Sequence, residues 1–460
     1  MTTRTRWARW LALALALVLT AAACGGGGRD DDSSSGGGDS GGGSDSTDAS
    51  GGSAQATPLD IDTSECVGDP TQGVTDDSIK FGTSVPQSGL FAAFSKIAEG
   101  YNAYFDYLNS EEGGVDGREI SVEVTDDGYE SGRTVSNVQQ LVQQDQVFGI
   151  FNVVGTPNNL AIRESLNQDC VPQLYAATGA ALWGNPEEFP FTIGSLPTYA
   201  TEMGVFVQYL EENAPTAKVA VLYQNDDFGK EYLDSIKALT EGTDIEIVAE
   251  ESYEPSDSDV DSQITSIANS GADTVLLGAT ALKCPQALDA LQGQSGFDPE
   301  TVWLSQTCTS STVIGLSSPG AAEGVLSAIY LKDPADPQWD DDPAMQEFQT
   351  QGAAHGLSAE QVEDGVVGIG WTFGELLAET IRNTPELNRE NIMQSAYSLD
   401  GVAVGLLLPG VTFTTNGAED PFPIETLQIG QYNGDYFDFI GDPIDLEGQS
   451  GEFTPDTEGG

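Results

Sequence analysis

The segment Val147-Phe-Gly-Ile-Phe-Asn-Val-Val154, followed by Gly155-Thr-Pro-Asn158, decides the fold class of this 460-residue chain. A nearly continuous apolar run is typical of a parallel strand that is covered on both faces. Thr is a common N-cap and Pro is favoured at the first helical position, so the second stretch predicts a turn from strand into helix. Free backbone N–H groups at such a turn can bind a carboxylate, although a plain helix cap is the commoner explanation of a single loop.

The same alternation of strand and helix repeats on both sides of this segment. Residues at a spacing of two predict strands, and apolar residues at a spacing of three to four predict helices. The first series has strands over 79–85, 120–124, 147–154 and 171–176, and helices over 94–108, 135–142 and from about 157. The second series has strands over 217–224, 245–248, 274–278, 302–305 and 324–331, and helices over 230–239, 260–268 and 285–291. Two such series predict an α/β protein with two lobes, each with a parallel sheet and helices on both faces.

The N-terminus predicts export. Three arginines precede the apolar run 11–23, which is too short for a membrane-spanning helix, so residues 1–23 predict a signal peptide. Cys24 directly follows Ala21-Ala-Ala23 and resembles the lipidated cysteine of bacterial lipoproteins, although that motif usually has Leu where Ala21 stands. An ordinary secretory signal with an incidental cysteine is the alternative. Gly, Ser and Asp dominate the stretch that follows, so we expect residues 24–65 to form a flexible tether.

The chain is strongly acidic, with 16 basic and 73 acidic residues and a net charge of −57. A field of that sign repels nucleic acid and anionic lipid headgroups, so we expect no nucleic-acid partner. Four cysteines remain after Cys24. An even number in an exported protein predicts two disulfides, for which three pairings are possible. The four residues are Cys66, Cys170, Cys284 and Cys308.

Polar and aromatic residues gather at the expected carboxyl ends of the strands, where open α/β sheets bind their ligands. Ser88-Gly89, Gly155-Thr156 and Ala177-Thr178-Gly179 follow strands of the first series and offer hydroxyl and N–H groups. Three such loops at one edge favour a site for an anion or an amide. Aromatic residues near these strand ends are typical of a small-molecule pocket, although core packing explains any one of them. They are Phe91, Phe94, Tyr175, Tyr223 and Phe228.

Signals for catalysis are weak. His355 is the only histidine and has no local motif, which disfavours a Ser-His-Asp triad or a histidine metal site. The sequence has no phosphate-binding P-loop, and the acidic stretch 333–342 lacks the spacing of an EF-hand. We therefore predict a binding protein that is not an enzyme and has no cofactor or metal; a secreted enzyme is the less favoured alternative.

Several motifs in a fixed order resemble the branched-chain amino acid type of periplasmic binding proteins over about residues 76–445. The motifs are Ile79-Lys-Phe-Gly-Thr-Ser-Val-Pro-Gln-Ser-Gly89, Gly113-Gly-Val-Asp-Gly-Arg118, Asp126-Asp-Gly-Tyr129, Gly155-Thr-Pro157, Val171-Pro-Gln-Leu-Tyr-Ala-Ala-Thr-Gly179, Phe189-Pro-Phe191, Leu222-Tyr-Gln-Asn-Asp-Asp-Phe-Gly229 and Ser270-Gly-Ala-Asp273. The resemblance implies the type I fold, in which two Rossmann-like lobes joined by three crossovers close on a ligand. It also implies an extracellular receptor that delivers a small molecule to the permease of an ABC importer.

With this fold, we expect the N-terminal lobe to hold residues 76–196 and 329–400, and the C-terminal lobe 197–328 and 401–445. Residues 446–460 are expected to be a disordered tail. The expected protein is a monomer anchored by its lipid to the outer face of the cell membrane. A ligand-sensing receptor of a signalling system on the same fold is an alternative role.

The resemblance also implies a binding site. Ser88, Gly155, Thr156 and the Ala177–Thr178 backbone match the carboxylate-binding set of the family. Phe94 and Phe228 match the aromatic residues that flank the ligand, and Thr280 and Gln306 match contacts from the second lobe. Family members selective for α-amino acids usually have an acidic residue near the position of Gln306, and this chain has none there. An unpaired ammonium in a closed cleft is costly, so amides, ureas and aromatic or aliphatic acids remain candidates beside amino acids.

Lobe closure bears on the disulfides. Cys66 and Cys170 fall in the expected first lobe, and Cys284 and Cys308 follow neighbouring strands of the second. A bond between lobes would oppose their movement. We therefore predict the pairs Cys66–Cys170 and Cys284–Cys308.

Overall fold

The first sheet of the protein has five parallel strands in the order β2-β1-β3-β4-β5. The computed structural model describes residues 57–453, so Cys24 and the predicted signal peptide lie outside the described residues. The strands are β1 (Ser78–Val85), β2 (Glu119–Asp126), β3 (Ile150–Phe151), β4 (Gln173–Ala176) and β5 (Thr192–Gly194). The helices between them are η1 (Ala92–Ser95), α1 (Lys96–Tyr107), η2 (Leu108–Glu112), α2 (Ser131–Gln143), α3 (Thr156–Gln168) and η3 (Ala181–Trp183).

Strand β3 is much shorter than the predicted strand over 147–154. Its neighbours Phe148 and Asn152 still donate backbone hydrogen bonds to Lys80 and Leu174 in the adjoining segments. Asn152, however, has a φ of 55°, which interrupts the extended backbone. The apolar run is buried as predicted, but regular strand geometry covers only its centre.

The second sheet has seven strands in the order β12-β11-β10-β9-β8-β6-β7. Strands β7, β6, β8, β9 and β10 are parallel, whereas β10, β11 and β12 pair in antiparallel fashion. The strands are β6 (Lys218–Gln224), β7 (Glu246–Tyr253), β8 (Thr274–Gly278), β9 (Thr301–Leu304), β10 (Leu326–Ile329), β11 (Thr426–Tyr432) and β12 (Phe437–Asp445). The helices are α4 (Tyr199–Asn213), α5 (Asp227–Thr240), α6 (Asp261–Ala268), α7 (Lys283–Gln292), η4 (Gln306–Cys308), α8 (Ser311–Ile314) and α12 (Ser450–Phe453).

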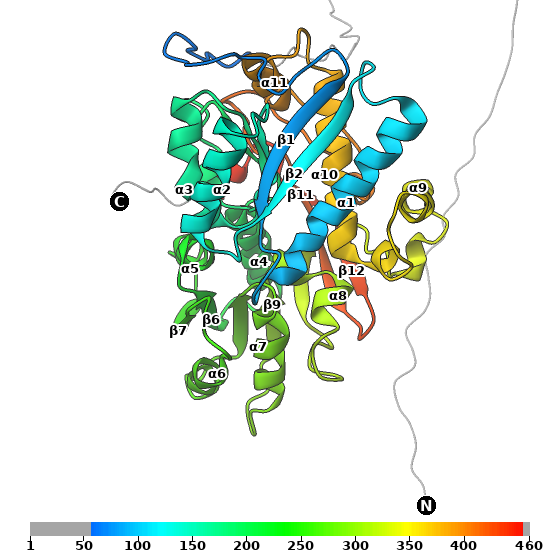
Figure 1. Cartoon of the computed structure of the whole chain (residues 1–460). Coiled ribbons are helices and arrows are strands. Elements are labelled where there is room, and N and C mark those ends of the chain that lie inside the picture. Colours follow the sequence, from blue (N-terminus) through cyan, green and yellow to red (C-terminus); the bar gives the residue numbers. More distant parts are fainter. Residues whose placement is uncertain (1–56, 454–460) are drawn as a thin grey trace, which may run out of the picture. The chain divides into compact units, whose positions relative to one another are not determined.

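After β10 the chain returns to the first sheet. This part contains η5 (Pro337–Trp339), α9 (Pro343–Ala354), η6 (Gln361–Glu363), α10 (Gly365–Arg382) and α11 (Arg389–Ala396). Figure 1 shows α10 lying alongside α1. The two backbones approach so closely that a Cβ at Gly100 would collide with the Val367 carbonyl, and one at Gly370 with the Ile97 carbonyl. Residues 343–396 are thus mainly helical.

Three predicted boundaries need correction. The tether ends before residue 65, because Leu59 and Ile61 are buried. Residues 401–423 do not extend the second sheet: the backbone N–H of Leu406 donates to Thr372 of α10, and only β11 and β12 join that sheet. The tail begins later than 446, because Leu446 is buried and the Ser450 hydroxyl bonds Thr201. In the first and third cases an apolar or hydroxyl side chain within a polar stretch attaches the segment to the body.

Both predicted disulfides are present, and each lies within one lobe. Cys66–Cys170 attaches the segment before β1 to the loop before β4, and Cys284–Cys308 joins α7 to η4. Within residues 57–453, no helix combines the length and the apolar character needed to cross a bilayer.

Candidate ligand-binding site

A cavity of about 60 Å³ lies at the carboxyl ends of strands from both sheets. From the first sheet, the segments after β3 and β4 contribute Val154, Gly155, Thr156 and Ala177. From the second sheet, the segments after β8, β9 and β10 contribute Thr280, Gln306, Thr307 and Tyr330. This is the position at which open α/β sheets bind ligands.

Aromatic rings form most of the wall of the cavity. They belong to Phe94, Tyr129, Tyr199, Phe228, Tyr330 and Phe373. Phe228 packs edge-on against Tyr199, with ring centroids 5.1 Å apart, so these walls support each other. None of the described residues that line this cavity carries a charge.

The polar end of the cavity is the start of α3. The Thr156 and Thr178 hydroxyls are buried and lie 2.5 Å apart, within hydrogen-bonding distance. Gly155, not Thr156, is the N-cap of the helix, which corrects the predicted capping role of the threonine. Gly155 has a φ of 99°, and a Cβ there would lie 2.5 Å from the Tyr129 ring, so both backbone geometry and space require glycine. The first-turn N–H groups of α3, which Pro157 lacks, have no intrahelical acceptors and form the positive end of the helix dipole.

Other predicted contacts of the first lobe are occupied elsewhere. The Ala177 N–H donates to Val153 and the Thr178 N–H donates to Ala176, so neither is a free donor. Ser88 is exposed, and its hydroxyl donates to Asp126 at 2.9 Å. Seven of the nine predicted ligand-binding residues line the cavity; Ser88 and Thr178 do not, although Thr178 supports Thr156.

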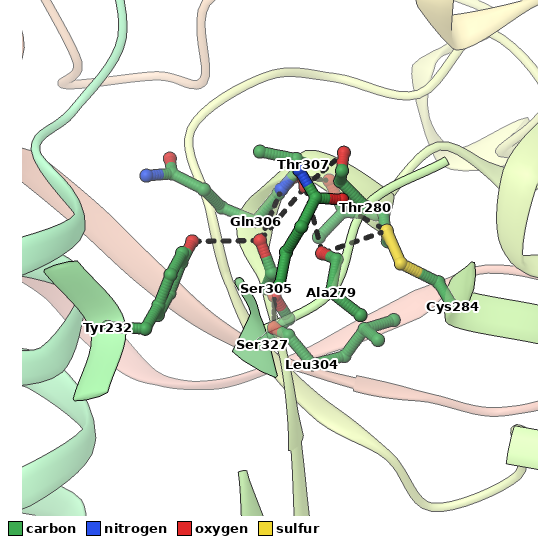
Figure 2. The surroundings of a disulfide bond; sticks show 12 residues. Tyr232, Ala279, Thr280, Cys284, Leu304, Ser305, Gln306, Thr307 and Ser327 are labelled. Carbon is green, nitrogen blue, oxygen red and sulfur yellow. Dashed lines mark hydrogen bonds between the residues drawn. A yellow bond between two sulfur atoms is a disulfide. The ribbon is translucent and has the colours of Figure 1, made fainter. Parts of the chain in front are cut away.

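A hydrogen-bonded network fixes the Gln306 loop of the second lobe (Figure 2). The Tyr232 and Ser305 hydroxyls lie 2.8 Å apart, and Ser305 also bonds the backbone N–H of Thr307. The Thr307 hydroxyl donates to the Ala279 carbonyl at 3.3 Å, at the end of β8. The Cys284–Cys308 disulfide lies directly beside this network. This disulfide joins the segments that follow β8 and β9, and it therefore holds in place the residues that face the cavity.

Glu202 is a structural residue of the site that sequence reasoning missed. It lies on α4 and is fully buried. Its carboxylate accepts hydrogen bonds from Trp303 Nε1 at 3.0 Å, the Gln306 backbone N–H at 3.1 Å and the Tyr232 hydroxyl at 2.6 Å. Burial raises its pKa from 4.5 to about 7, and the three donors lower it in part. The only sequence signal is an acid that lies among apolar residues in the first half of the helix, apart from the exposed Glu211 and Glu212 at its end.

Direct contacts cross between the two lobes near the cavity. The Glu231 carboxylate on α5 accepts the Ala181 backbone N–H at 2.7 Å. Burial raises the pKa of Glu231 from 4.5 to about 8, and the nearby Asp227 and Asp234 add to the shift. The pKa of Tyr129, which stacks on Phe91 in the first lobe, is raised by burial and by Asp226 of the second lobe. The described lobes are thus in contact around the cavity.

One acidic group among the described residues has metal-ligand geometry, but it lies elsewhere. Oxygens of Asp420, Glu425 and Glu447 lie within 4.8 Å of one another. Glu425 already accepts the N–H groups of Gly448 and Ser450. Burial and the two neighbouring carboxylates raise the pKa of Asp420 to about 7, so a shared proton accounts for the close approach. None of the three lines the cavity.

Comparison with known proteins agrees with this architecture. The chain is 27% identical over 202 residues to the Leu/Ile/Val-binding protein homolog 3 of Brucella melitensis biotype 1, covering 44% of this chain and about half of that protein (54%). A substrate-binding periplasmic protein from Ralstonia solanacearum has a similar structure (TM-score 0.69, 24% identity, 79% of this chain and 100% of the other). So does a branched-chain amino acid ABC transporter protein from Thermus thermophilus with bound valine (TM-score 0.70, 17% identity, 81% and 97%).

The two solved structures share the fold of this chain, with two lobes and a mixed α/β architecture. The model of one family, described as periplasmic binding protein, matches residues 78–436, which is most of the chain and includes both sheets up to the turn before β12. The chain is therefore a member of the periplasmic binding protein family, of the type I fold.

Proposed function

We propose that this protein is the extracellular solute receptor of an ABC importer and binds a small ligand that has a carboxylate or carbonyl group and no α-ammonium. The observation that carries this proposal is a cavity between the strand ends of two sheets with a helix N-terminus at one end, aromatic walls and no charged lining residue. The names of its relatives, a Leu/Ile/Val-binding protein homolog and a branched-chain amino acid ABC transporter, support the importer role. We also propose that the protein has no catalytic activity.

The carboxylates near the cavity are committed to other partners. Glu202 accepts three hydrogen bonds from its own lobe. Asp226 caps α5 by accepting the Gly229 N–H and also accepts from Gln224. An amino acid bound in this cavity would therefore bury an ammonium without a counter-charge, which is costly, whereas burying a methylene group is favourable.

Isothermal titration with three matched compounds tests the ligand class. Leucine, 4-methylpentanoic acid and 4-methylpentanamide share one side chain and differ in the ammonium and the acid. We expect the two compounds without an ammonium to bind at least tenfold more tightly than leucine. A ligand at about 100 times its Kd should also raise the unfolding free energy by about 2.7 kcal/mol. Tighter binding of leucine would refute the selectivity.

Two further experiments separate the importer from a signalling receptor and test the anchor. Deletion of the gene should abolish uptake of the ligand found by titration, whereas a signalling receptor would leave uptake intact. Cys24→Ser should release the protein from the membrane, because stable anchoring needs at least two acyl chains on that residue. An unmodified Cys24 thiol in mass spectra of the native protein would contradict lipidation.

A further inference from the structure

A second cavity lies beside the first. It has a volume of about 50 Å³ and shares Gln306, Tyr330 and Ile369 with the first cavity. These three side chains therefore form the partition between the two. The second cavity thus gives a ligand in the first cavity room to extend past this partition.

The partition carries an unpaired hydrogen-bond acceptor. The Gln306 side chain is 4% exposed, and its Nε2 donates to the Pro197 carbonyl at 2.9 Å. Because a carbonyl can only accept, this bond fixes which end of the amide is nitrogen. No described residue donates to Gln306 Oε1. A buried acceptor without a donor is unfavourable, so this atom is suited to a ligand that supplies an N–H or O–H group.

The rest of the second cavity is suited to an uncharged, apolar group. Trp339, Phe437 and Phe439 contribute aromatic rings. Lys332 is buried, forms an ion pair with Asp342 at 2.8 Å and lies over the Trp339 ring, so its charge is already compensated. Asp333 also lines the cavity, but its carboxylate accepts from the backbone and hydroxyl of Ser311, among other donors. Asp336 lines the cavity too and accepts the Gln338 backbone N–H at 2.9 Å, so both lining carboxylates are already hydrogen-bonded.

We infer that the two cavities together bind an elongated secondary amide. Its carbonyl group faces the start of α3, its N–H donates to Gln306 Oε1, and its apolar N-substituent passes Ile369 and lies against the Trp339 ring. This inference rests on the proposed function, because it places the first part of the ligand in the same site. It adds the requirement for a donor at the partition and a second binding region beyond it.

A series of three amides tests both additions by isothermal titration of the whole protein. The compounds are 4-methylpentanamide, N-butyl-4-methylpentanamide and N-butyl-N-methyl-4-methylpentanamide. We expect the N-butyl amide to bind at least tenfold more tightly than the primary amide, because the butyl group is buried in the second cavity. We expect N-methylation to weaken binding by about 5- to 150-fold, because it removes the donor to Gln306.

Two variants locate the effect. Thr309 lines only the second cavity, so Thr309→Phe should fill it and abolish the gain from the butyl group while 4-methylpentanamide still binds. Thr312→Phe, on the neighbouring α8 and at neither cavity, is the matched control. Gln306→Leu should remove the difference between the N–H and N-methyl amides.

The possible results are distinguishable. Binding of 4-methylpentanamide without a gain from the butyl group would overturn the second binding region and leave the proposed function standing. Equal affinity for the N–H and N-methyl amides would overturn the role of Gln306. Failure of all three amides to bind would overturn this inference, and failure of 4-methylpentanoic acid as well would overturn the proposed function. Because the ligand series needs only the unmodified protein, misfolding of a variant would not remove the test.

Discussion

Replacement of Glu202 should destabilise the protein and disorder the Gln306 loop. In Glu202→Ala, the Trp303 Nε1–H and the Gln306 N–H lose their common acceptor in a buried environment, whereas Tyr232 keeps its contact with Ser305. Each orphaned buried donor costs about 1–3 kcal/mol, so we expect a loss of about 2–6 kcal/mol. This is a large fraction of the 5–15 kcal/mol that typically stabilises a domain.

Glu202→Gln should be far milder, since one amide oxygen can accept both N–H groups and the amide nitrogen can donate to Tyr232. The two variants also differ in pH dependence. The pKa of Glu202 is raised from 4.5 to about 7 in the folded protein, so the folded state binds this proton more tightly than the unfolded state. Its contribution to stability is therefore full below about pH 4.5 and is lost as the pH rises through 7. Glu202→Gln cannot bind this proton, so its unfolding free energy should depend less on pH.

Urea denaturation at pH 5 and pH 8 measures both effects, and titration with 4-methylpentanoic acid reports the state of the loop. Glu211→Ala is the control, because Glu211 lies on the same helix but is exposed. We expect Glu202→Ala to lose affinity by at least tenfold and Glu202→Gln to retain most of it. If Glu202→Ala were as stable as Glu211→Ala, the carboxylate would not hold the loop. If Glu202→Gln were as unstable as Glu202→Ala, the charge would matter and the acceptor geometry would not.

Three further expectations follow from the site. Thr156→Val should weaken binding of 4-methylpentanoic acid by about 5- to 150-fold without unfolding the protein, and unchanged affinity on titration would exclude Thr156 from the site. Alanine at both Cys284 and Cys308 should lower the unfolding free energy by about 3 kcal/mol and also weaken ligand binding. Alanine at both Cys66 and Cys170 should lower the unfolding free energy by about 4–5 kcal/mol and leave affinity unchanged. Equal effects of the two double variants on affinity would contradict this. Burial and the charges of Asp227 and Asp234 raise the pKa of Glu231 from 4.5 to about 8 where the lobes meet. We expect opening of the lobes to expose Glu231, so that closure takes up a proton and affinity falls from pH 5 to pH 8, but not in Glu231→Gln.

The sheets could be predicted from the sequence because their signal is local. Alternating apolar residues in 79–85 and the continuous apolar run in 147–154 depend only on which faces are buried. The polar loops could be predicted equally well, because the carboxyl ends of parallel strands share one edge of the sheet. Strand β5 is only three residues long and gives no such periodic signal.

The residues that were missed are those defined by distant partners. Ile369 and Phe373 belong to a helix that begins about 270 residues after the start of α1, and only close packing of the two helices brings them to the cavity. In the sequence, Glu202 cannot be distinguished from other acidic residues on helices, because its three hydrogen-bond donors meet it only in the folded protein. Periodicity reports burial, but it does not report which buried groups meet.

The contrast between the charge of the chain and the neutrality of the cavity restricts the ligand. The net charge of −57 lies outside the cavity lining, and its field disfavours an anionic ligand, particularly at low salt. The same field attracts a cation, but the lining of the first cavity offers no carboxylate to replace the water that an ammonium would lose on burial there. A neutral ligand avoids both penalties. Its amide carbonyl can still use the N–H groups of α3, and its N–H can satisfy the Gln306 oxygen that no described residue pairs. Among the candidate ligands, the amide is therefore the one whose charge and hydrogen bonds the site matches best.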